Sequence, residues 1–488
     1  MLCMLVSLAA CGGTTPSDQT EKQSDTAESS TAVTTEPPKL EVPAYDGIFK
    51  VGYDRQSIAP KGDIYLKDGT HMTSVLDTTY ATCIAVNDGE TTVLLFTVDA
   101  GNVMVSAVRK VRTYVSRATG VPEENILVSG THSHSAPQPE TQLDKAQNAV
   151  WNTEFYEALE VAGKNAIADL DDAEIYVGST LAKDMSFVRR WIYEDGTPGG
   201  IWRQSTDKKK VAYESESDDL CQFIRFVRAE KKDILLTNWG IHFTNANGQF
   251  PKAVSADLGG NLRTTVEVLD EDVLFAYFIA PSGNISFTPY VDGTKKYGSY
   301  QKMAGQLSKQ IIDEMDNLTR VEAGKIKIDL YDYEVKVRKD DAETVAKAEK
   351  AQAEIKALGL YDGDAKVYEV CAMYGFESAK EVSSIVSRNK SSRADTEIAQ
   401  LSAVSFGGIG LVGVPYEMFD TNGIEVREAS PFKVTLVVTG CGGSAGYIPS
   451  ALAVPNGGYE VYTTPWEFGT AELVVNELLR MLREQAFN

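Results

Sequence analysis

The stretch TTVLLFTVDAG (residues 91–101), with the two segments that follow it, decides the fold class. It is a short, β-rich apolar run of the kind that forms a strand buried on both faces. MVSAVRKVRTYVSRATG (104–120) then spaces its valines as a helix does and ends at Gly120, and NILVSG (125–130) is a second buried strand. This order of strand, helix and strand predicts a βαβ unit with parallel strands.

Similar patterns continue along the chain. A helix is expected over 152–170, and strands that run into polar or glycine-rich loops are expected within 233–245, 273–286, 408–419 and 433–449. We therefore predict an α/β fold with a mixed, largely parallel central sheet or sheets and flanking helices. Its active site should lie at the carboxyl ends of the strands. Residues 341–395 are expected to form charged surface helices, and no chemistry is assigned to them.

The composition narrows the class of partner. The chain has 488 residues, of which 43% are hydrophobic, and its 69 acidic against 47 basic residues give a net charge of −22. A nucleic-acid-binding protein needs a basic surface, so that class is disfavoured.

The N-terminal segment indicates a lipoprotein. MLCMLVSLAAC (1–11) ends in Leu-Ala-Ala-Cys, which resembles a bacterial lipobox with Cys11 as the lipid-bearing residue. Residues 12–44 are rich in Ser, Thr, Pro and Glu and are expected to form a disordered tether. Residues 45–488 then form one catalytic domain, held outside the cytoplasm on the cell membrane by the lipid on Cys11. Because no Lys or Arg precedes the apolar run, a chance apolar segment is the alternative.

The stretch GTHSHSAPQPE (130–140) holds His132 and His134, half of the four histidines in the chain. On an extended backbone the side chains of residues i and i+2 project to the same side, so both rings can reach one ligand. The alternative is a pair of polar loop histidines with a structural role. Other strand ends deliver His242, Glu417 and Tyr447, which suggests one convergent site.

A single catalytic zinc fits these residue types. Zinc needs about three protein ligands and an open position, which His132, His242, Glu417 and Tyr447 would provide. A two-zinc amidohydrolase also carries a His-x-His motif, but it needs more histidines than this chain offers, since His71 lies in a turn without an assigned role. The cysteines Cys83, Cys221, Cys371 and Cys441 form no CxxC pair and are expected to be buried thiols or at most to form a disulfide.

These segments resemble, in the same order, motifs of the catalytic domain of the neutral/alkaline (non-lysosomal) ceramidases. The resemblance covers residues 45–488. SGTHSHSAP, NWGIHFT and GVPYEMF are similar to the segments of that family that contain Thr-His-Thr-His-Ser-Gly-Pro, Asn-x-x-x-His-Pro-Thr and Pro-Gly-Glu. Further similar segments are FVRRW (187–191), VSADLGGNLRTTVE (254–267), PSGNIS (281–286) and GYIPS…GGYE (446–460).

The resemblance implies a hydrolase of the α/β class that holds one Zn²⁺ per chain and cleaves the amide bond of a ceramide-like N-acyl lipid. The metal ligands would be His132, His242, Glu417 and Tyr447. His134 would move a proton, Arg189 would face the scissile carbonyl, Ser286 would contact the reacting amide, and Tyr459 would be a further contact.

The chain departs from the family pattern at positions that face substrate. Val188 stands where the family has Asn before the arginines, Tyr416 where it has Gly, and PSGNIS lacks the family's Asp. Amide hydrolysis is therefore better supported than ceramide as the substrate. The alternatives are a hydrolase of the same fold that acts on a non-lipid amide or ester, and a solute-binding lipoprotein of a transporter.

Overall fold

The predicted βαβ unit is present in the computed structural model. β6 (Thr92–Val98) leads through α1 (Val105–Thr119) to β7 (Ile126–Gly130), and the two strands pair in parallel with Leu94 opposite Ile126. α1 ends at Gly120, whose φ of 79° lies in the left-handed region that favours glycine.

The structure describes residues 39–140, 146–201, 207–293, 296–360, 364–391 and 393–488. Residues Pro38–Asn488 form one compact unit. Cys11 and residues 12–38 of the expected tether lie outside the described residues, so the lipoprotein prediction stays a prediction.

The larger sheet is mixed, as expected. Its order is β16-β14-β13-β8-β1-β5-β6-β7, with β18 also paired to β8. The strands not yet given are β1 (Lys50–Ser57), β5 (Tyr80–Asn87), β8 (Asp171–Leu181), β13 (Leu220–Arg228), β14 (Asp233–Trp239), β16 (Val273–Ile279) and β18 (Thr319–Val321). Only β6–β7 and β14–β16 pair in parallel, so the expectation of a largely parallel sheet is wrong. The short turns 88–91 and 229–232 return the chain directly onto the neighbouring strand, which forces antiparallel pairing.

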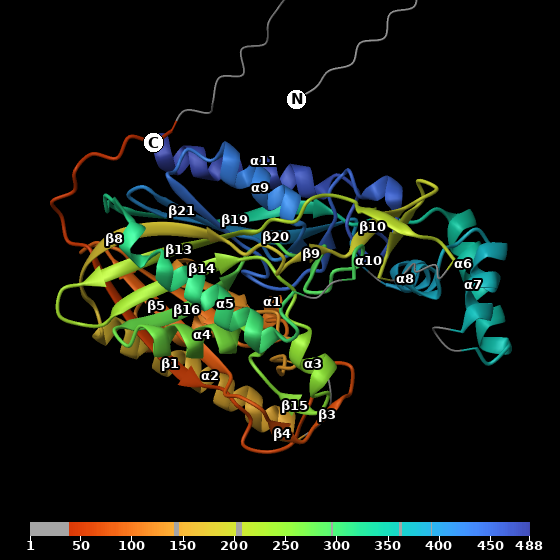
Figure 1. Ribbon diagram of the computed structural model, residues 1–488, viewed down its shortest axis with the longest axis horizontal. Coiled ribbons are helices and arrows are strands. Elements are labelled where there is room, and N and C mark those ends of the chain that lie inside the picture. Colours follow the sequence, from red (N-terminus) through yellow and green to blue (C-terminus); the bar gives the residue numbers. More distant parts are fainter. Residues whose placement is uncertain (1–38, 141–145, 202–206, 294–295, 361–363, 392) are drawn as a thin grey trace, which may run out of the picture. The chain divides into compact units, whose positions relative to one another are not determined.

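A second, four-stranded sheet packs against the first. It consists of β19 (Ile326–Lys336), β20 (Thr396–Phe406), β21 (Ile409–Gly413) and β23 (Val434–Val438), and its β21–β23 pair is parallel. The inner faces of the two sheets share one hydrophobic core. Helices cover the outer faces, which gives four layers in the order helix, sheet, sheet, helix (Figure 1). On the large sheet these are α1, α2 (Ala146–Ala168), α4 (Asp257–Leu269) and α5 (Tyr300–Asp313), and on the small sheet α9 (Asp420–Ala429) and α11 (Thr470–Phe487).

The four layers explain why the stretch 91–101, which contains β6, is apolar at nearly every position. Along β6, Leu94 and Phe96 join the core beneath α1 and α2, whereas Val93 and Leu95 join the core between the sheets. All four side chains are fully buried. Because alternate side chains enter two different cores, the strand shows a continuous apolar run instead of a polar–apolar alternation.

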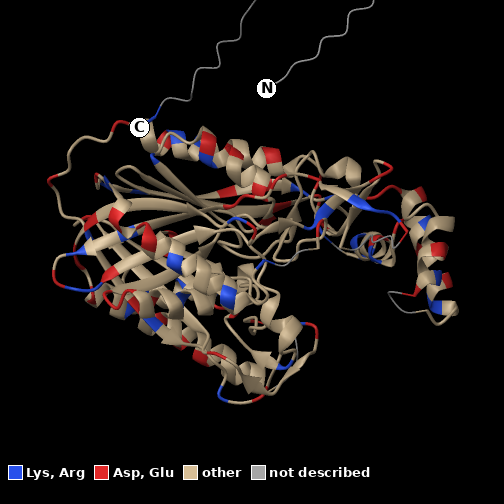
Figure 2. Ribbon diagram, viewed as in Figure 1, with Lys and Arg blue, Asp and Glu red and all other residues tan. Residues whose placement is uncertain are grey.

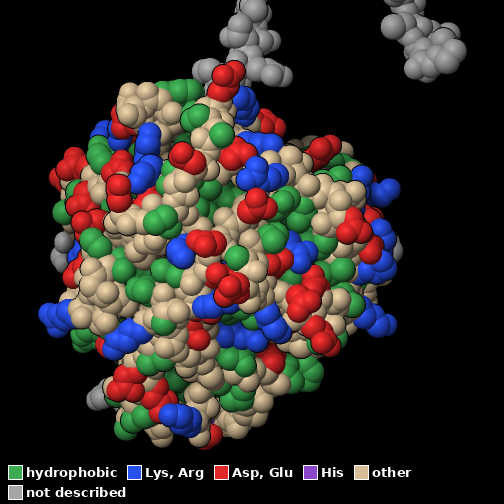
Figure 3. Space-filling model, turned by 90° about the vertical axis from the view of Figure 1, so that its left-hand side faces the viewer, with side chains coloured by type: hydrophobic (Ala, Val, Ile, Leu, Met, Phe, Trp, Pro, Cys, Tyr) green, Lys and Arg blue, Asp and Glu red, His purple; other side chains and the backbone are tan. Residues whose placement is uncertain are grey.

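Residues 341–395 contain the surface helices that the sequence predicts: α6 (Ala342–Ala357), α7 (Ala365–Met373) and α8 (Ala379–Lys390). They have a small hydrophobic core of their own, and α8 also contacts α10 (Tyr459–Thr463). Charged side chains lie mainly on the helices and loops, and the strands carry few of them (Figure 2). The face seen from the left of Figure 1 mixes acidic and basic groups and exposes no histidine (Figure 3).

Short elements complete the described chain. They are β2 (Ile64–Tyr65), β3 (His71–Met72), β4 (Ser74–Val75), β9 (Phe187–Val188), β10 (Arg190–Tyr193), β11 (Pro198–Gly200), β12 (Lys210–Tyr213), α3 (Asn245–Gln249), β15 (Ala253–Val254), β17 (Ile285–Ser286), β22 (Glu417–Met418) and β24 (Tyr447–Ile448). Within the described ranges, no helix is long and apolar enough to cross a membrane. Cys83, Cys221, Cys371 and Cys441 are buried free thiols, as expected.

Candidate active site

The predicted metal-binding residues lie just beyond the carboxyl ends of strands. His132 follows β7, and His242 follows β14. Glu417 begins β22, which follows β21, and Tyr447 begins β24, which follows β23. β22 and β24 pair in parallel with Glu417 directly opposite Tyr447, so this short ladder joins the last two residues.

The structure brings three histidines and one carboxylate together. The Nε2 atom of His132 lies 3.1 Å from Nε2 of His242 and 3.3 Å from Nε2 of His134. The Oε2 atom of Glu417 lies 3.4 Å from Nε2 of His132 and 3.6 Å from Nε2 of His242. The three histidines form a group that could hold a metal ion.

Hydrogen bonds on the far side of two rings fix their orientation. The Nδ1 atom of His242 lies 3.0 Å from the carbonyl oxygen of Ser282, which can only accept, so this nitrogen is the donor. The Nδ1 atom of His132 lies 2.9 Å from Oδ1 of Asn102 and donates in the same way. In a neutral imidazole this leaves Nε2 without a hydrogen, so both lone pairs point into the site.

The backbone that carries the histidine pair is strained. His132 has a φ of 63°, in the left-handed region that non-glycine residues rarely adopt. Neighbouring bonds hold it there: the Ser133 hydroxyl donates to the Ser255 carbonyl at 2.8 Å, and the amide of His134 donates to the Phe243 carbonyl at 2.9 Å. Strain of this kind persists only where the surroundings enforce it, and it concentrates at functional sites.

The donor set fits a cation. Two Nε2 lone pairs face each other at 3.1 Å, an arrangement that repels unless a positive charge lies nearby. The buried Oε2 atom of Glu417 has no hydrogen-bond partner among the described residues. Burial lowers the pKa of His132 to about 4, so this imidazole is neutral at pH 7, the form that binds metals. Burial also raises the pKa of Glu417, a cost that a bound cation would offset.

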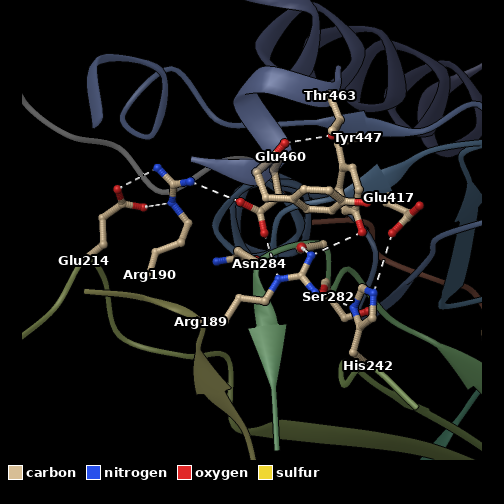
Figure 4. A network of polar contacts seen from close by, with 12 residues as sticks. Arg189, Arg190, Glu214, His242, Ser282, Asn284, Glu417, Tyr447, Glu460 and Thr463 are labelled. Atoms are coloured by element: carbon tan, nitrogen blue, oxygen red, sulfur yellow. Dashed lines mark hydrogen bonds and ion pairs between the residues drawn. The ribbon is translucent and has the colours of Figure 1, made fainter. Parts of the chain in front are cut away.

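Arg189 connects the site to a buried polar network (Figure 4). One of its terminal nitrogens donates to the carbonyl oxygen of Gly283 at 2.6 Å and to the hydroxyl of Tyr447 at 3.2 Å. Its Nε atom donates to Oε1 of Glu460 at 2.7 Å. Tyr447 and Glu460 help to hold the pKa of Arg189 above its ordinary value although burial acts to lower it.

Glu460, which lies beside the predicted Tyr459, is not among the residues that the sequence predicts for the site. Oε2 of Glu460 also accepts a bond from Arg190 at 3.1 Å, and Arg190 is held in addition by both carboxylate oxygens of Glu214 at 2.6 and 2.9 Å. Two arginines and two glutamates thus form a network with no net formal charge, which fixes the direction of the Arg189 side chain. The only sequence signal for this role was adjacency to Tyr459.

A cavity of about 590 Å³ opens onto the metal-binding group. His132, His134 and Glu417 line it together with Tyr447 and Tyr459. The rings of Tyr447 and Tyr459 meet edge to face with centroids 5.6 Å apart. His134 is solvent-exposed, unlike His242, which is 2% exposed, so it stands at the boundary between the group and the cavity.

The predicted site residue Ser286 lies near Arg189 but does not face the cavity that opens onto the histidines. It lies on β17, which pairs with β9 next to Arg189, and its hydroxyl accepts a bond from the amide of Thr288 at 3.2 Å. It is not among the described residues that line the cavity. The same loop contacts the site through Ser282 and Gly283 instead, by way of their backbone carbonyls.

Solved structures share this fold. Neutral ceramidase from Pseudomonas aeruginosa matches with a TM-score of 0.65 and 14% sequence identity, over 91% of this chain and 75% of that one. A structure described as ceramidase complexed with C2 matches with a TM-score of 0.65 and 14% identity, over 90% and 76% of the two chains. No protein-family model matches the chain, and no curated protein sequence does. The resemblance that the motifs indicate is therefore confirmed at the level of the fold.

Proposed function

We propose that this protein is a zinc-dependent hydrolase that cleaves the amide bond of a ceramide-like N-acyl lipid into a sphingoid base and a fatty acid. The observation that carries the proposal is the convergence of two imidazole Nε2 atoms, from His132 and His242, on the orphaned Oε2 atom of Glu417. The likeness in fold to neutral ceramidase supports it.

Zinc suits these donors because it accepts imidazole nitrogen and carboxylate oxygen in a site with an open position. His132, His242, Glu417 and Tyr447 would hold one ion. When bound, zinc supplies a Lewis acid and lowers the pKa of water so that a nucleophile exists at neutral pH.

His134 is the residue proposed to move the proton. Its ring is exposed to the cavity, and its Nε2 atom lies 3.3 Å from that of His132. From this position a neutral imidazole can accept a proton from the attacking water and donate it to the departing amine nitrogen.

Arg189 and Tyr459 are proposed to stabilise the negative charge that develops on the scissile carbonyl oxygen. The contacts of Arg189 with Glu460 and the Gly283 carbonyl fix the direction of its guanidinium before substrate binds. Donors that are already oriented stabilise developing charge without a reorganisation cost. Ser286 is proposed to contact the reacting amide.

A panel of N-acyl substrates, assayed with and without a zinc chelator, tests this function. We expect amine release from a long-chain N-acyl substrate, loss of activity with the chelator and recovery when zinc is added back. Tight binding of a solute without turnover would contradict the proposal and support the transporter lipoprotein. Turnover confined to non-lipid amides or esters would support the third alternative.

We also propose that the chain is anchored to the outer side of the cell membrane through lipid on Cys11. The support is the Leu-Ala-Ala-Cys sequence and the polar composition of residues 12–44. A catalytic domain on such a tether would act on substrates at or near the membrane surface.

A further inference from the structure

A second cavity, of about 550 Å³, lies beside the one that opens onto the histidines. Tyr447, Tyr459 and Lys380 line both cavities, so they form the border between the two. The second cavity extends from this border along α8, the helix that contacts α10 in the fold (Figure 1).

The wall that α8 presents to this cavity is polar. Lys380, Ser383, Ser384 and Ser387 all line it, and their spacing of i, i+3, i+4 and i+7 places them on one face of the helix. Ser391 continues the face just after the helix ends. A wall that held a hydrocarbon chain would need apolar side chains at these positions, because burying unpaired hydroxyls against hydrocarbon costs free energy.

The charge of the cavity is opposite to that of the protein. Lys380, Arg388 and Arg393 line it and no Asp or Glu among the described residues does, although the whole chain has a net charge of −22. Arg388 is held by two bonds to Asp340, and Arg393 by two bonds to Glu397. These ion pairs neutralise the charges of the two arginines but leave the charge of Lys380 without a partner among the described residues.

Lys380 forms no ion pair with any residue that the structure describes. Its ammonium lies over the ring of Tyr459, 5.7 Å from the centroid. It is the second residue of α8, where a cation is opposed by the positive end of the helix dipole, so helix stability does not explain it. An unneutralised cation is thus placed where the two cavities meet.

We propose that this cavity binds an anionic group of the substrate, a carboxylate, phosphate or sulfonate, with Lys380 and the hydroxyls of Ser384 and Ser387 as its donors. The hydroxyl of Ser383 already donates to the backbone carbonyl of Lys380 at 3.1 Å, so it is not counted among them. The inference rests on the proposed amide hydrolysis and narrows its substrates, among ceramide-like N-acyl lipids, to those that carry a negative charge near the scissile amide. Cationic and hydroxyl donors on one wall are the groups that recognise such anions. A substrate with a neutral head group would leave the charge of Lys380 unpaired.

The test compares two substrates that share a chain and a two-carbon spacer: N-lauroyltaurine, which is anionic, and N-lauroylethanolamine, which is neutral. We expect wild-type kcat/KM to favour the taurine conjugate at least about tenfold, the scale of one charge-assisted hydrogen bond. Lys380→Gln should abolish this preference mainly through KM, and Lys380→Arg should retain it. Lys390→Gln, on the same helix but not lining the cavity, is the matched control and should behave as wild type.

The inference is overturned if wild type favours the neutral substrate or if Lys380→Gln keeps the preference. Calorimetry measures the binding of N-lauroyltaurine and N-lauroylethanolamine to wild type and Lys380→Gln without requiring turnover. It therefore distinguishes a failure of the anion-site inference from a failure of the proposed hydrolase function. If neither amide is cleaved with zinc present, the hydrolase proposal fails. Lys380-dependent selective binding of the sulfonate would still support the anion site, and equal binding by both proteins would refute it.

Discussion

Replacing His134 with Ala separates proton transfer from metal binding. The His134 side chain is exposed, and its backbone amide still donates to Phe243 in the variant, so the free energy of unfolding should change by no more than about 0.5 kcal/mol. General acid–base catalysis contributes about 10²–10⁴ in rate, which corresponds to about 2.7–5.4 kcal/mol of activation free energy. We expect kcat to fall by that factor while zinc stays at about one ion per chain.

The assay pairs metal analysis of the purified protein with steady-state kinetics on one N-acyl substrate. His132→Ala is the comparison variant and should lose zinc, because its Nε2 atom lies at the centre of the group, within 3.4 Å of donor atoms on His134, His242 and Glu417. If zinc falls as far in His134→Ala as in His132→Ala, His134 is a ligand and the proposed mechanism is wrong. If His134→Ala keeps the zinc content and the kcat of the wild type, His134 has no part in the mechanism.

Two further predictions follow from the contacts around the site, and a third follows from the N-terminal sequence. Glu460→Ala should lower the free energy of unfolding by about 3–5 kcal/mol, because it leaves the two buried guanidiniums of Arg189 and Arg190 without their shared partner. The control Asp313→Ala, which removes an exposed ion pair with Lys309, should lower it by less than about 0.5 kcal/mol. Equal denaturation midpoints for the two variants would contradict this prediction. Asn102→Ala should weaken zinc affinity about 10–100-fold in a chelator competition, because it removes the acceptor that orients the ring of His132, and an unchanged affinity would refute that role. Cys11→Ser should move the protein from the membrane fraction to the soluble fraction of its host, whereas unchanged retention would exclude the lipid anchor.

The parts of the fold that the sequence predicts are those with a strong local signal. β6 and β7 are apolar along their length because both of their faces are buried, and α1 between them ends at a glycine. The direction of strand pairing has no comparable signal. It depends on whether a connection is a turn such as 88–91 or a crossover helix, and the sheet is less parallel than expected for that reason.

The residues of the candidate site also fall into those with a local sequence signal and those without one. The convergence of His132, His242, Glu417 and Tyr447 could be expected because each follows a recognisable strand, and their role as metal ligands stays a prediction. Glu460 could not, because its role arises only when the fold brings it to Arg189, 271 positions away in the sequence.

The polar face of α8 was also beyond sequence analysis. A stripe of serine and lysine on a helix indicates a solvent-exposed surface, and α8 does belong to the predicted surface helices. Only its packing beside α10 turns that stripe into the wall of a cavity.

The placement of the proposed ligands follows from the three parallel strand pairs described within the two main sheets, β6–β7, β14–β16 and β21–β23. Each of these six strands is followed by one residue that is a proposed metal ligand or that hydrogen-bonds to one: Asn102, His132, His242, Ser282, Glu417 and Tyr447 respectively. A parallel strand must leave the sheet by a crossover, so its loop has room to carry a side chain over the sheet edge, whereas a tight antiparallel turn does not. The strands β5 and β13, which are followed by the tight turns 88–91 and 229–232, accordingly precede none of these six residues. The proposed ligands converge because the two sheets align the carboxyl ends of their parallel pairs. A one-residue change in the loop after any of these six strands should therefore disturb the proposed metal site more than a change in the turns 88–91 or 229–232.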